Sequence, residues 1–124
     1  MCKVNSNLFS TSQDNQDSPS IHDNLAVLKD IFPFTNNRWG IPGNSSGVRL
    51  IISSNQYASA RLFWSILSRG ANPEPLPNHH GLRVIFDDGS LAIYRENTST
   101  QNSPAIEYTI INQPRVKIHF KKEL

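Results

Sequence analysis

The chain has 124 residues, of which 37% are hydrophobic, and a formal net charge of +2 at pH 7; this length suits one domain with a modest core. Its single cysteine, Cys2, excludes an internal disulfide and a cysteine-rich zinc site. No apolar run has the length of a membrane-spanning helix, and the N-terminus lacks the hydrophobic core of a signal peptide, so we expect neither membrane insertion nor self-directed export.

A polar first segment is followed by the first predicted helix. Residues 1–19 are rich in Ser, Asn, Gln and Asp, so we expect a flexible leader or linker there and a single domain over residues 20–124. Ser20 and Asp23 form a capping box, which predicts a helix start, and Pro33 ends the helix. Apolar residues between them recur at helical spacing: Ile21, Leu25, Leu28 and Phe32.

Residues 33–49 hold three of the six glycines and two prolines, which predicts a long loop. Its string GIPGNSSG is able to hold an anion with backbone N–H groups, and Trp39 either stacks on a base or, as we favour, covers the core. A second helix is predicted over residues 56–68, capped by Ser53 or Ser54 and followed by Gly70. Its core-facing stripe comprises Ala60, Phe63, Trp64 and Leu67.

The C-terminal half reads as a series of strands. Residues 82–86 and 91–95 flank Asp87-Asp88-Gly89-Ser90, a strong hairpin signal, and two further strands are predicted over 105–111 and 115–121. No metal site is expected, because the adjacent His79 and His80 point apart in an extended chain and lack companion ligands at a metal-like spacing. The predicted fold is α+β: two N-terminal helices packed on an antiparallel sheet of about four strands.

The last predicted strand, RVKIHFK, carries the main functional signal. Because side chains alternate along a strand, Val116, Ile118 and Phe120 are expected to face the core. The other face is then a row formed by Arg115, Lys117, His119 and Lys121. Such a row suits a polyanion, and the histidine adds a group that exchanges protons near neutral pH. The alternative is the solvated face of an edge strand, where lysine is common.

These residue types suit RNA cleavage without a metal. That reaction needs a base for the 2′-OH, a cation for the phosphorane charge and an acid for the leaving 5′ oxygen. His119 is the candidate base or acid, Arg95 and Lys117 are candidate charge stabilisers, and Thr98 and Ser103 are candidates for orienting the phosphate. No Asp or Glu lies between Asp30 and Glu74, so the arginines of that stretch join the strand's outer cations as candidate nucleic-acid contacts: Arg61, Arg69, Arg115 and Lys121.

Other chemistries lack their motifs. A metal-dependent restriction-type nuclease needs a Glu-x-Lys pair, but Glu107 is followed by Tyr108 and Thr109. The Gly-x-Ser-x-Gly of serine hydrolases and the His-x-Glu with Pro-Cys-x-x-Cys of deaminases are both absent. A non-enzymatic nucleic-acid-binding module that uses the same basic face remains an alternative, and no cofactor is expected.

The string DDGSLAIYRENTSTQNSPAIEYTI followed by VKIHF resembles the C-terminal toxin domains of bacterial polymorphic toxins of the contact-dependent inhibition, Rhs and LXG types. With GIPGNSSGVRLI and the helix that ends at Gly70, the resemblance covers roughly residues 40–120. It implies a ribonuclease toxin of the barnase, colicin and RelE-like group, with tRNA a frequent substrate, and it draws attention to Tyr94-Arg95, Ser103 and Lys117–His119. A DNase of the same family, or a toxin of that family that acts on another target, is a further alternative.

Toxins of this kind act inside a neighbouring cell. The resemblance therefore implies delivery from the cell surface or by secretion, as part of a larger toxin, followed by action in the cytoplasm of the target cell. It also implies a cognate immunity protein in the producing cell. Since opposite charge speeds association and the inhibitor must block RNA, we expect this partner to be acidic and to cover the face with Arg95, Lys117 and His119.

Overall fold

The computed structural model describes residues 19–77, 81–98 and 102–123. Its two helices are α1 (Ile21–Ile31) and α2 (Gln56–Leu67). The strands before and just after α2 are β1 (Phe34–Thr35), β2 (Arg38–Trp39), β3 (Ile41–Pro42), β4 (Val48–Ser53) and β5 (Glu74–Pro75). The remaining strands are β6 (Leu82–Ile85), β7 (Leu91–Arg95), β8 (Ala105–Thr109) and β9 (Val116–Lys122).

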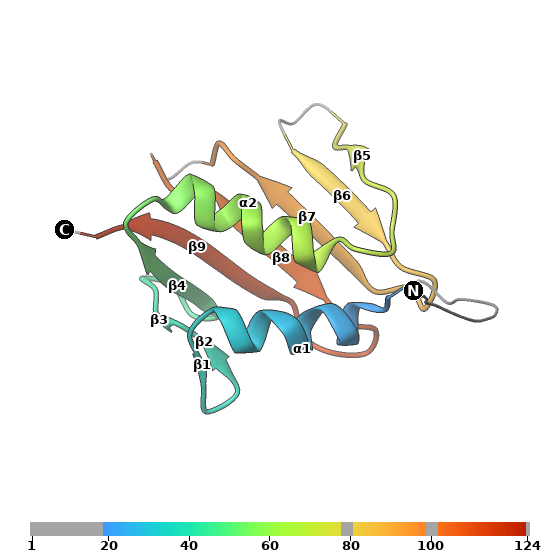
Figure 1. Cartoon of the computed structure of the whole chain (residues 1–124), viewed down its shortest axis with the longest axis horizontal. Coiled ribbons are helices and arrows are strands. Elements are labelled where there is room, and N and C mark those ends of the chain that lie inside the picture. Colours follow the sequence, from blue (N-terminus) through green and yellow to red (C-terminus); the bar gives the residue numbers. More distant parts are fainter. Residues whose placement is uncertain (1–18, 78–80, 99–101, 124) are drawn as a thin grey trace, which may run out of the picture.

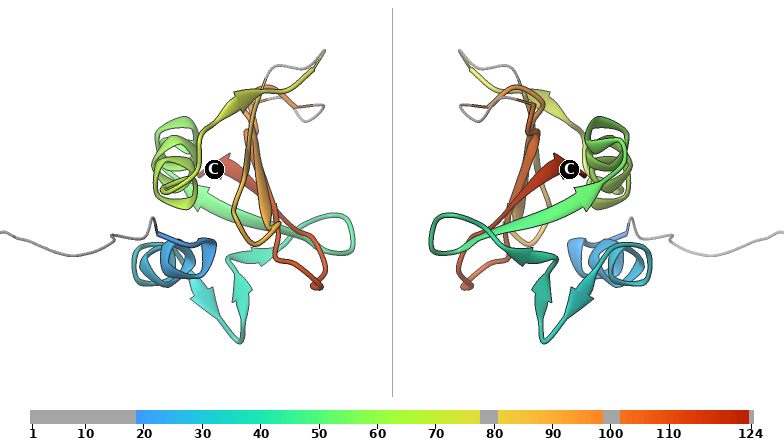
Figure 2. Two further views of the ribbon diagram at one scale, coloured as in Figure 1. Left: turned by 90° about the vertical axis from the view of Figure 1, so that its right-hand side faces the viewer. Right: turned by 90° about the vertical axis from the view of Figure 1, so that its left-hand side faces the viewer.

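Seven strands form one mixed sheet in the order β3-β4-β9-β8-β7-β6-β5, and β1 and β2 form a separate ribbon (Figure 1). Strands β4 and β9 run parallel, whereas every other neighbouring pair in the sheet is antiparallel. Both helices pack on one face of this sheet, and no element of the described residues covers the opposite face (Figure 2). This second face is called the open face below.

The predicted fold class is wrong in two respects. The sheet has seven strands and is mixed, and the helices are not both N-terminal, because β1 to β4 lie between α1 and α2. The cause is β4, whose residues pair in parallel with β9 from Val48 opposite Lys117 to Ser53 opposite Lys122. Two parallel strands must be joined by a long crossover, which here is the whole segment from α2 to β8. No local turn signal in the sequence therefore predicts that β4 and β9 pair. The predicted loop over residues 33–49 likewise contains short strands.

Local signals gave the helices correctly but one cap incorrectly. The Ser20 side chain accepts a hydrogen bond from the Asp23 backbone N–H, and Asp23 accepts one from Ser20 N at 3.0 Å, which confirms the capping box of α1. The N-cap of α2 is Asn55, whose Oδ1 accepts from Ala58 N at 3.1 Å. Ser53 does not cap α2: its Oγ accepts a hydrogen bond from Asn55 N and lies 2.6 Å from Ser59 Oγ.

The core lies between the helices and the sheet. Phe63 of α2 packs against Trp39 and Phe120 with ring centroids 5.1 and 5.5 Å apart. Trp39 is 2% exposed and donates from Nε1 to the hydroxyl of Tyr108 at 2.8 Å, so it is a core residue as expected. Ile118 and Phe120 are fully buried, which confirms the predicted inward face of the last strand.

A buried amide joins the two helices. Asn24 of α1 is fully buried and donates from Nδ2 to the carbonyl oxygens of Leu67 and Arg69, at 2.9 and 2.8 Å. The last carbonyl groups of a helix lack intrahelical hydrogen-bond donors, and the Asn24 amide supplies such donors at the end of α2. Within the described residues, neither helix has the length and apolar character required to cross a membrane.

Candidate active site on the open sheet face

Strand register brings the predicted residues of the C-terminal half onto the open face. Arg95 of β7 lies opposite Ala105 of β8, which lies opposite His119 of β9. Two residues further along β8, Glu107 lies opposite Lys117 of β9. Residues directly opposite one another in a sheet point to the same side, so Arg95, Glu107, Lys117 and His119 share one face.

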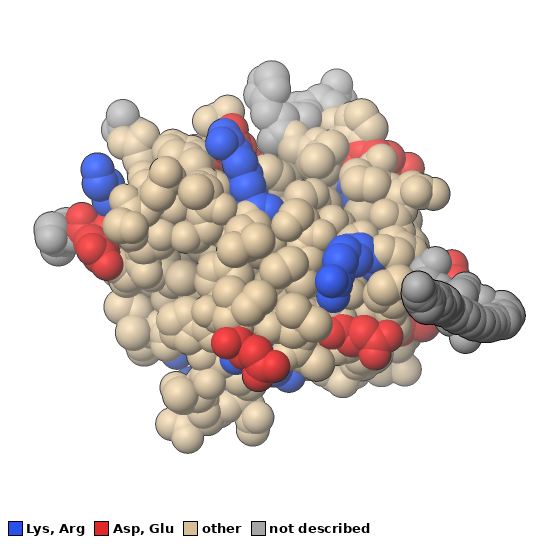
Figure 3. Space-filling model, in the orientation of Figure 1, with Lys and Arg blue, Asp and Glu red and all other residues tan. Residues whose placement is uncertain are grey.

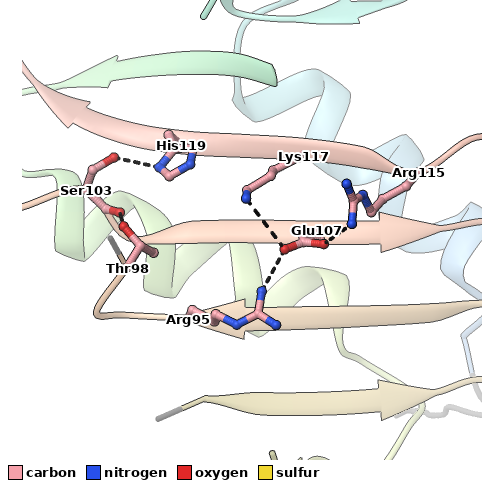
Figure 4. A network of polar contacts seen from close by, with 7 residues as sticks. All are labelled: Arg95, Thr98, Ser103, Glu107, Arg115, Lys117 and His119. Carbon is pink, nitrogen blue, oxygen red and sulfur yellow. Dashed lines mark hydrogen bonds and ion pairs between the residues drawn. The ribbon is translucent and has the colours of Figure 1, made fainter. Parts of the chain in front are cut away.

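A carboxylate lies in the middle of these cations (Figure 4). Glu107 Oε2 is 2.7 Å from Arg95 Nη1 and 4.0 Å from Lys117 Nζ, and its Oε1 is 3.3 Å from Arg115 Nη1. Although Glu107 is on the open face, its side chain is only 9% exposed, because the three cationic side chains surround it. Each cation is more exposed than the carboxylate, so all three remain accessible to a second anion.

Glu107 is the residue that sequence reasoning missed. The sequence analysis considered it only as part of a metal-nuclease motif, in which it lacks the following lysine. A usable signal existed, because alternation along residues 105–109 puts Ile106 and Tyr108 inward and Glu107 outward. Its position opposite Lys117 depends on the β8–β9 register, which the sequence alone leaves open.

His119 is held by the segment that precedes β8. Its Nδ1 is 2.9 Å from Ser103 Oγ, and the Ser103 carbonyl accepts a hydrogen bond from Thr98 Oγ1 at 2.8 Å. Ser103 is 1% exposed, so its position is fixed by packing. The sequence prediction treats Thr98 and Ser103 as groups that orient a phosphate, whereas here both support the imidazole ring (Figure 4).

The surroundings of His119 favour its neutral form. Burial and the nearby ammonium group of Lys117 lower the pKa of His119 below its ordinary value, and Lys121 acts in the same direction. The Ser103 backbone and Glu107 favour the protonated form but do not reverse the shift in pKa. A bound phosphate at this place would add negative charge and raise the pKa of His119 again.

The structure does not bring Arg61 and Arg69 to this face. Arg61 Nε is 2.8 Å from Glu96 Oε1, which also accepts from the Tyr94 hydroxyl at 2.6 Å, and Arg69 is exposed just beyond the end of α2. Tyr94 points inward and stacks on Trp64 at 5.8 Å, and burial raises its pKa. The helix side of the molecule shows scattered charges of both signs rather than a basic patch (Figure 3).

A cavity of about 910 Å³ lies at one end of the sheet, away from His119. Its walls come from α1, the β1–β2 ribbon, the loop between β3 and β4, and the turn before β9. Arg115 lines it, but Ser103, Glu107, Lys117 and His119 do not. The open face and this cavity are therefore two different places that share one arginine.

The described residues contain no cluster of three or more His, Cys, Asp and Glu side chains arranged to hold a metal. His79 and His80 lie outside the described residues, as does nearly all of the predicted leader. Comparison of the chain with protein-family models, with curated proteins and with solved structures finds no match.

Proposed function

We propose that this domain is an endoribonuclease that cleaves RNA by general acid–base catalysis on the open face, without requiring a metal. The observation that carries this proposal is the placement of Glu107 and His119 together on that face, on neighbouring strands. Diagonal neighbours across an antiparallel ladder have Cα atoms about 7–8 Å apart. That separation lets the two side chains approach a phosphodiester from either side.

The contacts of each group suggest its role. Glu107 is a carboxylate paired with three cations, and we assign it as the base for the 2′-OH. His119 is then the acid: in its protonated form, which a bound phosphate favours, it gives a proton to the leaving 5′ oxygen. The 2′ oxygen forms its bond to phosphorus as the bond to the 5′ oxygen breaks, and a 2′,3′-cyclic phosphate remains.

The cations around Glu107 supply the electrostatic part of catalysis. A pentacoordinate phosphorane carries more negative charge than the phosphodiester, and preorganised donors stabilise that charge. Arg95 and Lys117 lie on the same face as both Glu107 and His119, so a phosphate there contacts them directly. As the phosphate binds, it competes with Glu107 for these cations, which leaves the carboxylate freer to accept a proton.

Ser103 and Thr98 are positioning residues in this proposal. The Ser103 hydroxyl contacts Nδ1 of His119, so the other ring nitrogen is left to face the substrate. Thr98 holds the Ser103 backbone in turn. The resemblance to polymorphic toxins supports the remaining parts of the proposal, which are tRNA or another RNA as substrate, delivery as part of a larger protein, and an acidic immunity protein.

The test is a cleavage assay on purified protein in EDTA, with RNA and with DNA of the same sequence. We expect RNA fragments that end in a 2′,3′-cyclic phosphate, and no DNA cleavage because DNA lacks the 2′-OH nucleophile. Cleavage that needs added magnesium would contradict the mechanism, and cleavage of DNA would support the DNase alternative. RNA binding without cleavage would support the non-enzymatic alternative.

A further inference from the structure

The cavity at the end of the sheet is built for an anion. The described residues that line it include neither an Asp nor a Glu but four cationic residues: Lys29, Arg38, Arg49 and Arg115. A cavity lined by one sign of charge concentrates ligands of the opposite sign. Among the described residues Arg38 forms no ion pair, so its charge is available to a ligand.

The other walls suit a nucleotide better than a simple ion. The loop from Gly43 to Gly47 contributes the polar residues Asn44, Ser45 and Ser46, and the β1–β2 turn adds Asn37. The aromatic residues Phe34, Trp39 and Tyr108 also belong to the wall, although Trp39 and Tyr108 are largely buried in the core behind it. The wall combines polar, cationic and aromatic residues, and its volume of about 910 Å³ lies in the range of small-molecule sites.

Arg115 connects this cavity to the open face. It lines the cavity and also lies 3.3 Å from Glu107, and it directly precedes β9, four residues before His119. At ~3.3 Å per residue, that is about 13 Å along β9. Figure 2 shows the loop before β4 and the turn before β9 projecting past the same part of the sheet.

We propose that the cavity is a second RNA subsite, which holds a nucleotide of the same strand at a short distance from the cleaved phosphodiester. The inference rests on the proposed function only because it assumes that the neighbouring phosphodiester is cleaved. RNA binding in the cavity does not depend on catalysis. Lys29, Arg38 and Arg115 contact phosphate, and the polar loop groups contact the sugar or the base edge. Arg49 has a structural role, because its guanidinium group donates hydrogen bonds to the carbonyl oxygens of Trp39 and Gly40.

The test compares RNA binding with and without the cavity. In the His119→Ala background, which keeps RNA intact, affinities are measured for a dinucleotide and for a single-stranded 12-nucleotide RNA. Arg38→Gln removes one cavity cation, and Ser46→Glu adds a negative charge to the exposed loop. Arg69→Gln is the matched control, because it removes an exposed arginine on the helix side.

Both cavity variants should weaken binding of the longer RNA severalfold and leave dinucleotide binding unchanged. Arg38→Gln should also lower the slope of log affinity against log salt by about 0.7, the value for one lost contact to a single strand. Unchanged affinity for the longer RNA in both variants would overturn the subsite, as would an equal loss in the Arg69→Gln control. If the wild-type chain binds the longer RNA through Arg38 but cleaves no RNA, the proposed function fails and the subsite stands.

Discussion

Glu107 and His119 lie diagonally across the β8–β9 ladder, on the face of the sheet that neither α1 nor α2 covers. A carboxylate and an imidazole are thus neighbours on this face. Arg95, Lys117 and Arg115 surround the carboxylate, and Ser103 holds the ring. This arrangement is the basis of the predictions that follow.

The first prediction concerns pH. If His119 is the acid, kcat/KM falls as pH rises through the pKa of His119 in the free protein, which is below the ordinary histidine value. Lys121→Gln removes a cation that lowers this pKa, so the descending limb should move to higher pH. Lys117→Gln should move it further while also lowering the rate. Initial rates against pH, with an NMR titration of the His119 ring, provide the measurement; a limb that stays in place in both variants would exclude His119 as the acid.

The second prediction concerns the salt dependence of RNA binding. Lys117→Gln and Arg115→Gln should each reduce the slope of log affinity against log salt by about 0.7, because each removes one phosphate contact to a single strand. Arg69→Gln should leave the slope unchanged, since Arg69 lies on the helix side. Fluorescence anisotropy at several salt concentrations gives these slopes. The open face would lose its assigned role if only the Arg69 variant changed the slope.

The third prediction concerns stability. Asn24→Ala leaves the carbonyls of Leu67 and Arg69 without their donor, which should lower the free energy of unfolding by about 1–3 kcal/mol. The exposed Asn72 supplies the control, because Asn72→Ala should change it by less than about 0.5 kcal/mol. Urea denaturation measures both. Equal stability of the two variants would mean that the Asn24 contacts contribute nothing to the joining of the helices.

The fourth prediction concerns the immunity protein. An acidic inhibitor that covers the open face should associate more slowly with Lys117→Glu or Arg115→Glu, because charge reversal replaces attraction with repulsion. Arg69→Glu, on the helix side, should have little effect. Association rates at low and high salt separate this steering from loss of fold. A neutral or basic inhibitor that binds the helix side and leaves RNA binding intact would contradict the prediction.

The sequence supplied the local parts of this structure. The capping box at Ser20, the turn at Gly89 and the alternation from Val116 to Phe120 depend on neighbouring residues, and all three are confirmed. Gly89 has a φ of +93°, the backbone conformation that a glycine adopts most easily. The partnership of β4 with β9 spans more than half the chain, so no local pattern encodes it.

The candidate site, like the fold, has one part that the local sequence predicts and another that depends on contacts between distant segments. Lys117 and His119 belong to β9 and Arg115 directly precedes it, so alternation alone predicts that they share a face. Glu107 joins them through the register of two strands, and Ser103 reaches His119 from the segment before β8. The expected phosphate contacts of Arg61 and Arg69 came from a charge count along the chain, which carries no information on which face a residue occupies.

The most direct measurement is a double-mutant cycle on RNA cleavage with Glu107→Gln and His119→Gln, after circular dichroism shows that each variant is folded. Each single change should lower kcat/KM by about 10²–10⁴, because each removes one proton-transfer group. The double variant should lose much less than the product of the two losses, because the groups act in one step. A folded Glu107→Gln or His119→Gln protein that cleaves RNA at the wild-type rate would contradict the account.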